Sequence, residues 1–123
     1  MTHCVLLCDD EVHILRAAQF KLQRGGYTIR TAPDGQEAWE SIQRERPDLV
    51  ITDLQMPRLN GLELAQRIRG DARTRDLPVI LLTAKGYELA RDEVIDSLGL
   101  AALLTKPFSP RELLQLVKQT LET

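Results

Sequence analysis

The sequence predicts an α/β fold in which helices cover both faces of a doubly wound, five-stranded parallel sheet. Two observations support this prediction. Short apolar runs alternate with amphipathic stretches five times along the 123 residues. Three of the five runs show little alternation of apolar and polar residues, which is typical of strands that are covered on both faces. A repeated strand–helix order favours a parallel sheet, because each helical crossover carries the chain back to the same edge.

Five apolar runs are predicted as strands. They are Cys4–Cys8, Tyr27–Thr31, Leu49–Thr52, Val79–Thr83 and Ala101–Leu104. The stretches between them keep the spacing of amphipathic helices, with apolar residues recurring on one face. These faces are Leu15, Ala18 and Leu22 in the first helix, Gly61, Leu64, Ala65 and Ile68 in the third, and Leu114, Val117 and Leu121 in the last.

Helix caps predict where these helices begin and end. The candidate caps are Gly25-Gly26 after the first helix, Asp34 with Glu37 before the second, Asn60 before the third, and Ser109, Pro110 and Glu112 before the last. Asp, Asn and Ser side chains accept hydrogen bonds from the free N–H groups at a helix start, and glycine often ends a helix. Each cap falls beside a boundary that the apolar spacing indicates.

Length and composition are those of one globular domain over residues 1–123. Hydrophobic residues make up 43% and charged residues 28%, and the net charge is −2. This balance predicts no direct contact with nucleic acid, and no apolar run is long enough to span a membrane. The N-terminus has no cationic segment before its short apolar run, so we expect no signal peptide and a cytoplasmic protein. Cys4 and Cys8 would lie roughly 13 Å apart on one strand, too far for a disulfide.

Charged and hydroxyl residues lie at the ends of four of the five predicted strands. Asp9, Asp10 and Glu11 follow the first, Asp53 follows the third, Thr83 ends the fourth, and Lys106 follows the fifth. Because parallel strands end at one edge of a sheet, and ligands bind beyond that edge, we expect these side chains to lie together. Three gathered carboxylates would repel one another by on the order of several kcal/mol. A bound Mg²⁺ ion, which prefers oxygen ligands, would offset this repulsion.

Each of these residues also has an ordinary structural role. Asp9 and Asp10 could cap the first helix, Asp53 could be a turn residue, and Thr83 could end a strand. Together, however, the side chains suit phosphoryl transfer. A carboxylate can attack phosphorus to form an acyl phosphate, while an ammonium and a hydroxyl pair with the phosphoryl oxygens. The buried strand before Asp53 would hold such a nucleophile in place.

Four motifs carry a resemblance to a known family over essentially the whole chain. They are LLCDDE (Leu6–Glu11), DLVITDLQMPRLNG (Asp48–Gly61), ILLTA (Ile80–Ala84) and LLTKPF (Leu103–Phe108). In this order they resemble the receiver domains of two-component response regulators, the CheY-like superfamily. The resemblance implies a flavodoxin-like sheet of strand order 2-1-3-4-5 flanked by five helices, and a phosphoacceptor that acts in two-component signal transduction.

The resemblance also implies a metal site and a phosphorylated residue. Asp53 would take a phosphoryl group from the phosphohistidine of a sensor histidine kinase or a phosphotransfer protein. Mg²⁺ would be bound directly by Asp10, Asp53 and the backbone carbonyl of Gln55, and by Asp9 mainly through metal-bound water. The chain would assist its own phosphorylation and dephosphorylation without being an enzyme of conventional turnover.

The phosphoryl group would contact Thr83 as the switch hydroxyl, together with Ala84 and Lys106, and the peptide bond before Pro107 would be cis. Phosphorylation would change the face built from the fourth helix, fifth strand and fifth helix. That change would control an output domain or a target protein. The resemblance leaves open whether phosphorylation also produces a dimer.

One position departs from the family pattern. Leu103 stands where an aromatic side chain that swings inward on phosphorylation is common. The usual coupling between hydroxyl and aromatic ring would therefore not operate here. We expect Thr83 to move the following loop, residues 84–90, with Gly86 as a hinge.

Other classes fit the residues less well. A haloacid-dehalogenase-type phosphatase carries a D-x-D motif after the first strand, whereas Asp53 follows the third and Gln55 stands two residues beyond it. A flavodoxin-like binding module needs a loop that cradles phosphate, and the loop after the first strand is acidic. A receiver-like domain that cannot bind metal is disfavoured because every acidic position is filled. A stand-alone, Mg²⁺-dependent aspartyl-phosphate phosphatase or a phosphorelay protein remains an alternative.

Overall fold

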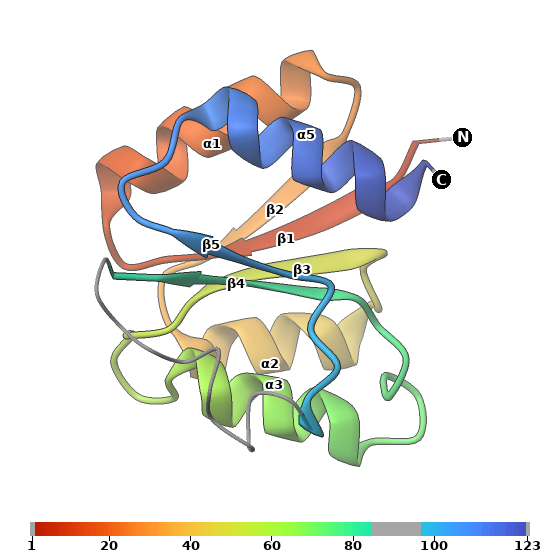
Figure 1. Ribbon diagram of the computed structural model, residues 1–123. Helices are drawn as coiled ribbons and strands as arrows, with labels where there is room; N and C mark the ends of the chain where they lie inside the picture. Colours follow the sequence, from red (N-terminus) through yellow and green to blue (C-terminus); the bar gives the residue numbers. More distant parts are fainter. Residues whose placement is uncertain (1, 85–96, 123) are drawn as a thin grey trace.

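The computed structural model describes residues 2–84 and 97–122, and its elements follow the predicted order (Figure 1). They are β1 (Cys4–Cys8), α1 (Val12–Arg24), β2 (Thr28–Ala32), α2 (Gly35–Arg44), β3 (Leu49–Asp53), α3 (Gly61–Gly70), β4 (Val79–Thr83), β5 (Ala102–Thr105) and α5 (Pro110–Leu121). The predicted fourth helix would fall between β4 and β5, where residues 85–96 lie outside the described part of the chain. None of the described helices is long and apolar enough to cross a membrane.

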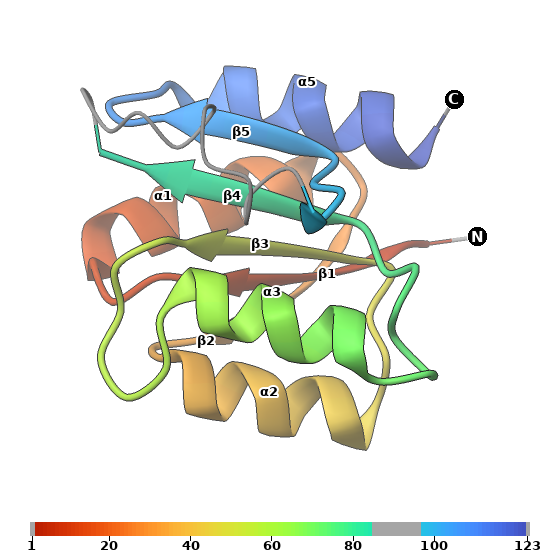
Figure 2. The same ribbon diagram turned by 60° about the horizontal axis from the view of Figure 1, so that its bottom comes forward.

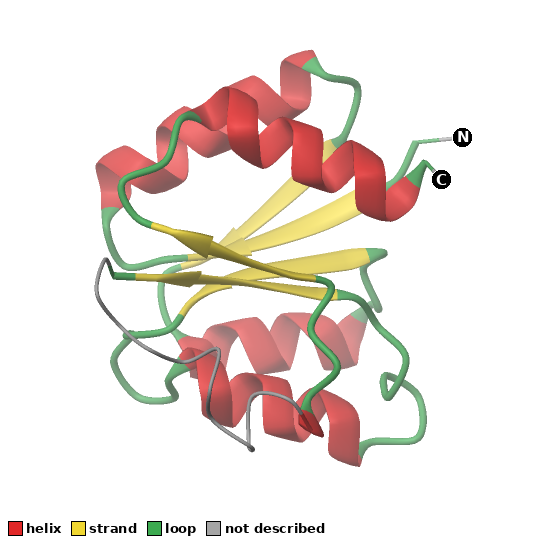
Figure 3. Ribbon diagram, in the orientation of Figure 1, coloured by secondary structure: helices red, strands yellow, loops and turns green. Residues whose placement is uncertain are grey.

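The five strands form one parallel sheet in the order β2-β1-β3-β4-β5. Helices α1 and α5 cover one face of this sheet, and α2 and α3 cover the other (Figures 2 and 3). The strand order reverses beside β1, which pairs with β2 on one side and β3 on the other. The predicted doubly wound fold and its strand order are confirmed.

Each face of the sheet has its own apolar core. The cluster under α1 and α5 includes Val5, Leu7, Leu22, Ile51 and Val117, and the cluster under α2 and α3 includes Leu6, Ile42, Val50, Leu64 and Ile68. Successive residues of a strand point to opposite faces of the sheet. Because both faces are covered by a core, β3 and β4 are buried along their whole length. Neither strand can shift without disturbing both cores, which makes them rigid supports for the residues at their ends.

Three strands differ from the prediction, each by one residue at one or both ends. Strands β2 and β5 each begin and end one residue later than expected, and β3 extends to Asp53. Tyr27 belongs to the turn that ends α1, because its N–H donates to the carbonyl oxygen of Leu22 at 3.2 Å across Gly26, which has a φ of 100°. Asp53 pairs with Leu82 of β4. Its position is therefore fixed by the sheet and not by the loop that follows.

Helices α2, α3 and α5 begin at the predicted caps. Asp34 caps α2 through its carboxylate. Asn60 and Ser109 form full capping boxes with Glu63 and Glu112, in which each side chain bonds the backbone of the other residue. The cap at Asn60 fixes the direction in which the loop from β3 enters α3.

The first residue of α3, Gly61, lies directly against the end of β3. Its N–H donates to the carbonyl oxygen of Leu54 at 2.8 Å. A Cβ atom at this position would lie 2.3 Å from the carbonyl oxygen of Asp53, a backbone atom of a paired strand. Glycine at position 61 therefore allows the helix to start close to the carboxylate of Asp53.

We expect Gly61→Ala to lower the free energy of unfolding by roughly 2 kcal/mol or more, because the added methyl group overpacks against backbone. Gly70→Ala is a matched control in the same helix, since nothing lies within 4 Å of a Cβ atom there. Its better helix propensity should leave stability unchanged or raise it by up to about 1 kcal/mol. Urea unfolding followed by circular dichroism measures both variants. Equal midpoints would contradict the close approach at Gly61.

Candidate functional site

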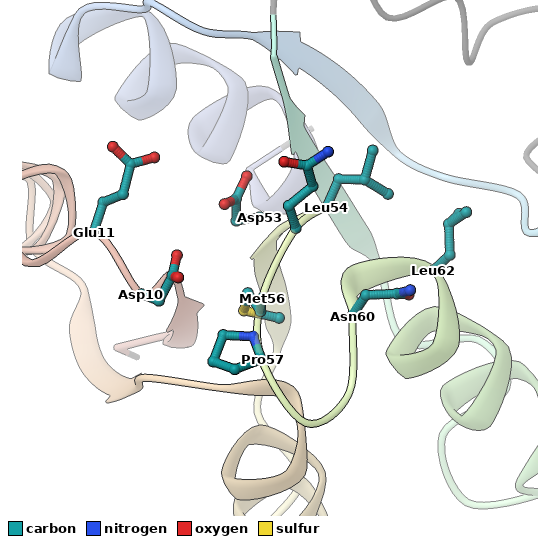
Figure 4. A pocket seen from close by; sticks show the side chains of 9 residues that line it. Asp10, Glu11, Asp53, Leu54, Met56, Pro57, Asn60 and Leu62 are labelled. Atoms are coloured by element: carbon teal, nitrogen blue, oxygen red, sulfur yellow. The ribbon is translucent and has the colours of Figure 1, made fainter.

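The predicted site residues lie together at the carboxyl edge of the sheet. Asp9 and Asp10 follow β1, Asp53 is the last residue of β3, Thr83 is the last residue of β4, and Lys106 follows β5. Figure 4 shows the carboxylates of Asp10 and Asp53 facing the same open pocket. Segments that are far apart in the sequence converge here because parallel strands end together.

The three aspartates form one acidic cluster. One carboxylate oxygen of each lies within 4.8 Å of those of the other two. Asp9 and Asp53 are only 3% and 6% exposed, whereas Asp10 is exposed. Carboxylate oxygens are the donors that Mg²⁺ prefers, and the exposed side at Asp10 leaves room for the waters that this ion keeps. The cluster could therefore hold a divalent metal ion.

Lys106 supplies the positive charge of the site. Its Nζ lies 2.7 Å from Glu11 Oε1, 3.1 Å from Asp9 Oδ2 and 3.3 Å from Asp53 Oδ1. Burial lowers the pKa of Lys106, but its contacts with Glu11 and Asp9 and the charge of Asp53 outweigh burial, so the pKa is raised. The ammonium is therefore charged at neutral pH. With Asp10 included, one ammonium faces four carboxylates, and the site keeps an excess of negative charge.

Burial changes the acidity of two carboxyl groups in this site. Burial raises the pKa of Asp53 to about 6, with a further contribution from the charge of Asp9, while Lys106 and the N–H of Leu54 oppose the change. Burial also raises the pKa of Asp9, against the effects of the Glu11 N–H and Lys106. The fold thus disfavours the ionised forms of both groups, and a bound cation would relieve this cost. Perturbed groups of this kind cluster at functional sites.

Two buried side-chain atoms in the described part of the chain have no hydrogen-bond partner, and both belong to this site. They are Asp9 Oδ2 and Thr83 Oγ1. The contact between Asp9 Oδ2 and Lys106 is an ion pair without hydrogen-bond geometry. An unpaired buried polar group costs roughly 1–3 kcal/mol, so native proteins usually keep one where a ligand or water completes it. Thr83, which is 1% exposed, thus places a buried hydroxyl without a hydrogen-bond partner at the end of β4.

The loop between β3 and α3 lines an open cavity of about 770 Å³ over the cluster (Figure 4). Gln55, Met56 and Pro57 contribute to its lining, and Asp10 and Glu11 contribute from the loop after β1. Gln55 is exposed, two residues beyond the end of β3. The cavity gives a ligand a direct approach from solvent to the carboxylate cluster.

Several other predicted positions surround the site. The Lys106–Pro107 peptide bond is cis. Ala84 is exposed and directly follows β4, while the loop beyond it, with the hinge expected at Gly86, lies outside the described residues. Leu103 is partly buried against a small apolar cluster. That cluster consists of Leu54, Ala65, Leu81 and Leu98. Leu103 thus packs against a cluster that includes Leu54, the residue that follows Asp53 in the chain.

Two charged contacts near the site were not predicted from the sequence. Glu11 pairs with Lys106 although 95 positions separate them. Arg58, in the loop between β3 and α3, has a φ of 71° and pairs with Asp34 at 3.3 Å. The acidic run after β1 placed Glu11 near the site but indicated no partner. No local signal indicates the pair of Arg58, because contacts between distant segments follow only from the fold.

A parallel sheet whose carboxyl edge gathers an acidic cluster, an ammonium and a buried hydroxyl has the architecture of a phosphoacceptor domain. The sequence over residues 5–118 matches the family described as the response regulator receiver domain, and the chain belongs to this family. It is a receiver domain and has the phosphoacceptor role of two-component signalling.

Curated relatives and solved structures agree with this assignment. The chain is 39% identical over 98% of its length to the alkaline phosphatase synthesis transcriptional regulatory protein PhoP of Bacillus subtilis, and 40% identical over 95% to the phosphate regulon transcriptional regulatory protein PhoB of Pseudomonas aeruginosa. It spans about half the length of these relatives, 49% and 51%.

Two solved structures share the fold closely. The chemotaxis response regulator CheY4 of Vibrio cholerae has a TM-score of 0.89 at 30% identity, with 98% of this chain and 100% of that one covered. The receiver domain of the Francisella response regulator 1452 has a TM-score of 0.86 at 31% identity, with 97% and 96% covered.

The raised pKa of Asp53 predicts how the metal-free protein responds to pH. The stability that a neutral Asp53 gives below its ordinary pKa of 3.8 is lost as the pH rises through about 6. We therefore expect Asp53→Asn to raise the free energy of unfolding by on the order of 2 kcal/mol near pH 7.5, and by much less near pH 4. Thermal unfolding in the presence of a chelator measures the difference.

Asp76→Asn is the matched control, because its side chain is 85% exposed and lies 4.0 Å from Arg46. This variant should unfold like the wild-type protein at both pH values. A gain for Asp53→Asn that is the same at both pH values would show that the charge of Asp53 is not the cause.

Proposed function

We propose that Asp53 is the residue that accepts the phosphoryl group, from the phosphohistidine of a sensor histidine kinase or a phosphotransfer protein. The supporting observation is that Asp53 combines access to the cavity with a contact to Lys106 at 3.3 Å. Asp10 lines the cavity and has the more exposed carboxylate, and Asp9 contacts Lys106 from a buried position. Asp53 is also fixed by the ladder between β3 and β4, which suits a nucleophile that must be held in place.

The transfer follows from the chemistry of these groups. A carboxylate oxygen of Asp53 attacks phosphorus and forms a P–O bond, while the P–N bond to the donor imidazole breaks and its electron pair returns to the ring nitrogen. Lys106 pairs with one phosphoryl oxygen and the Thr83 hydroxyl donates to another, which satisfies the hydroxyl that is unpaired in this structure. Attack of water on the same phosphorus later breaks the P–O bond to Asp53, releases inorganic phosphate and restores the carboxylate, which returns the switch to its resting state.

The same proposal includes a resident metal ion. Asp10, Asp53 and the backbone carbonyl of Gln55 would hold Mg²⁺ directly, and Asp9 would hold it mainly through water. The set of hard oxygen donors and the excess of negative charge support this assignment. When bound, the ion neutralises charge on the phosphoryl oxygens and on the attacking carboxylate.

Our inference about what this receiver controls rests on its relatives. The relatives named above are transcriptional regulatory proteins of about twice this length. We infer that this receiver controls an output domain or target protein through the face that contains β5 and α5, in a cytoplasmic two-component system.

A dimer that forms on phosphorylation is one way to transmit the change. Gel filtration with and without a phosphodonor separates this route from a monomeric switch, which would elute unchanged.

Intact-mass measurement tests the phosphorylated residue. After incubation with acetyl phosphate and Mg²⁺, the wild-type chain should gain the mass of one phosphoryl group, and it should gain little or none in the presence of a chelator. Asp53→Asn should gain none. Asp76→Asn, a matched substitution at an exposed aspartate, should be phosphorylated like the wild type. A gain by Asp53→Asn equal to that of the wild type would refute the assignment.

A small apolar hollow beside the site offers a place for the donor protein. Its volume is about 200 Å³, and its lining consists of His13, Ile14, Ala17, Ala18, Phe108 and Pro110. It lies between α1 and the start of α5, two residues from Glu11 on one side and two from Lys106 on the other. A protein that delivers a phosphoryl group to Asp53 must approach this edge, so we infer that the donor packs an apolar side chain here.

Ala17→Arg tests this docking surface, because Ala17 is exposed and arginine is a good helix former. The variant should slow phosphoryl transfer from a phosphorylated kinase fragment about tenfold, which corresponds to the loss of one modest apolar contact. Phosphorylation by acetyl phosphate should not change, because a small donor needs no docking surface. The fragment is chosen from a kinase panel by its labelling of the wild-type chain. Equal slowing with both donors would rule out docking at this hollow.

A further inference from the structure

The shortest contact of the site lysine is made by a residue outside the acidic cluster. Glu11 Oε1 lies 2.7 Å from Lys106 Nζ, closer than either Asp9 at 3.1 Å or Asp53 at 3.3 Å. It is also the contact that has hydrogen-bond geometry. We propose that Glu11 is a positioning residue that holds the Lys106 ammonium in the resting site and competes with the phosphoryl group for it. This inference rests on the proposed phosphorylation of Asp53.

The side chain of Glu11 is directed to Lys106 and away from its own helix. Glu11 is the N-cap residue of α1, yet its side chain makes no cap hydrogen bond. The N-caps of α2, α3 and α5, in contrast, are short side chains that bond the N–H three residues on. The backbone N–H of Glu11 donates to Asp9 Oδ1 at 2.9 Å, which fixes the residue beside the cluster. A longer carboxylate at this N-cap thus reaches across to the end of β5.

The three partners of Lys106 differ in how easily they can release it. Asp9 and Asp53 are buried, and a buried carboxylate that loses its cation is strongly destabilised. The side chain of Glu11 is 57% exposed and can be rehydrated when the ammonium leaves. When a phosphoryl group adds negative charge at Asp53, the contact with Glu11 is therefore the one that yields.

Glu11 consequently determines how strongly the ammonium of Lys106 can pair with the phosphoryl group. In the resting site it occupies one N–H of Lys106. Its removal should strengthen the attraction of Lys106 for a phosphodonor and for the phosphoryl group once it is attached. The effect expected of one partly exposed ion pair is a change of about three- to fivefold.

Phosphorylation by acetyl phosphate at saturating Mg²⁺, followed by intact mass, tests the proposal. Glu11→Gln should lower the half-saturating donor concentration about three- to fivefold, with little change in the maximal rate, and should lengthen the lifetime of the phosphorylated form. Glu40→Gln, which removes an exposed carboxylate from α2, is the matched control and should behave like the wild type. A Glu11→Gln variant with wild-type kinetics would overturn the proposal.

Glu11→Asp separates the ion pair from simple repulsion between Glu11 and an anionic donor. The shorter carboxylate keeps the charge, but it should cap α1 as Asp34 caps α2 and so leave Lys106. We expect Glu11→Asp to resemble Glu11→Gln. If Glu11→Asp resembles the wild type while Glu11→Gln does not, net charge and not the pair is the cause, and the proposal fails.

A double-mutant cycle in the metal-free protein measures the coupling energy between Glu11 and Lys106 without any phosphorylation. Urea unfolding of Glu11→Gln, Lys106→Met and the double variant should show that the two substitutions are not additive. Additive effects on the free energy of unfolding would show that the two side chains have no coupling energy, and would overturn the proposal. The two hypotheses can fail separately: a wild-type chain that gains no phosphoryl mass refutes the proposed function, whereas wild-type kinetics in Glu11→Gln refutes only the role of Glu11.

Discussion

Three carboxylates contact one ammonium at the carboxyl edge of the sheet, and a fourth, that of Asp10, lies in the same acidic cluster. The repulsion among these carboxylates constrains the structure around them. Asp9 and Asp53 are buried, and the loss of hydration that burial imposes on their charged forms raises both pKa values. The carboxylates stay together because Asp53 ends a strand with apolar cores on both faces. The fold thus gives up stability at this edge and recovers it in the two cores, as proteins often do at functional sites.

The side chains of the site differ in how deeply they are buried, and burial determines how freely each can move and how well water can reach it. Asp53 and Thr83 end buried strands and cannot move without disturbing the cores. Lys106 follows the last strand of the sheet and carries its charge on a flexible stem. Glu11 is exposed and retains access to water. In the proposed function, strand ends that stay fixed and a lysine on a flexible stem would allow the charge balance to change while the aspartates stay in place.

The loop between β3 and α3 shows how local strain is retained near such a site. Arg58 adopts a positive φ of 71°, which costs a residue with a side chain on the order of 1 kcal/mol. Its guanidinium pairs with Asp34, whose carboxylate also caps α2. Gly61 then admits α3 against the end of β3. These contacts tie the cavity loop to two helices and hold it over the acidic cluster.

The sequence by itself determined the strands, most helix caps and the residues at the strand ends. Those features are local, since apolar spacing and cap residues act within a few positions, and parallel strands must end together. It also determined the family, through motifs such as the run from Asp48 to Gly61. Only the tertiary structure decided that β3 includes Asp53, because that boundary depends on pairing with Leu82. The tertiary structure likewise decided that Glu11 holds Lys106, since an ion pair between residues 95 positions apart is set by the packing of the whole sheet and by no pattern in the chain.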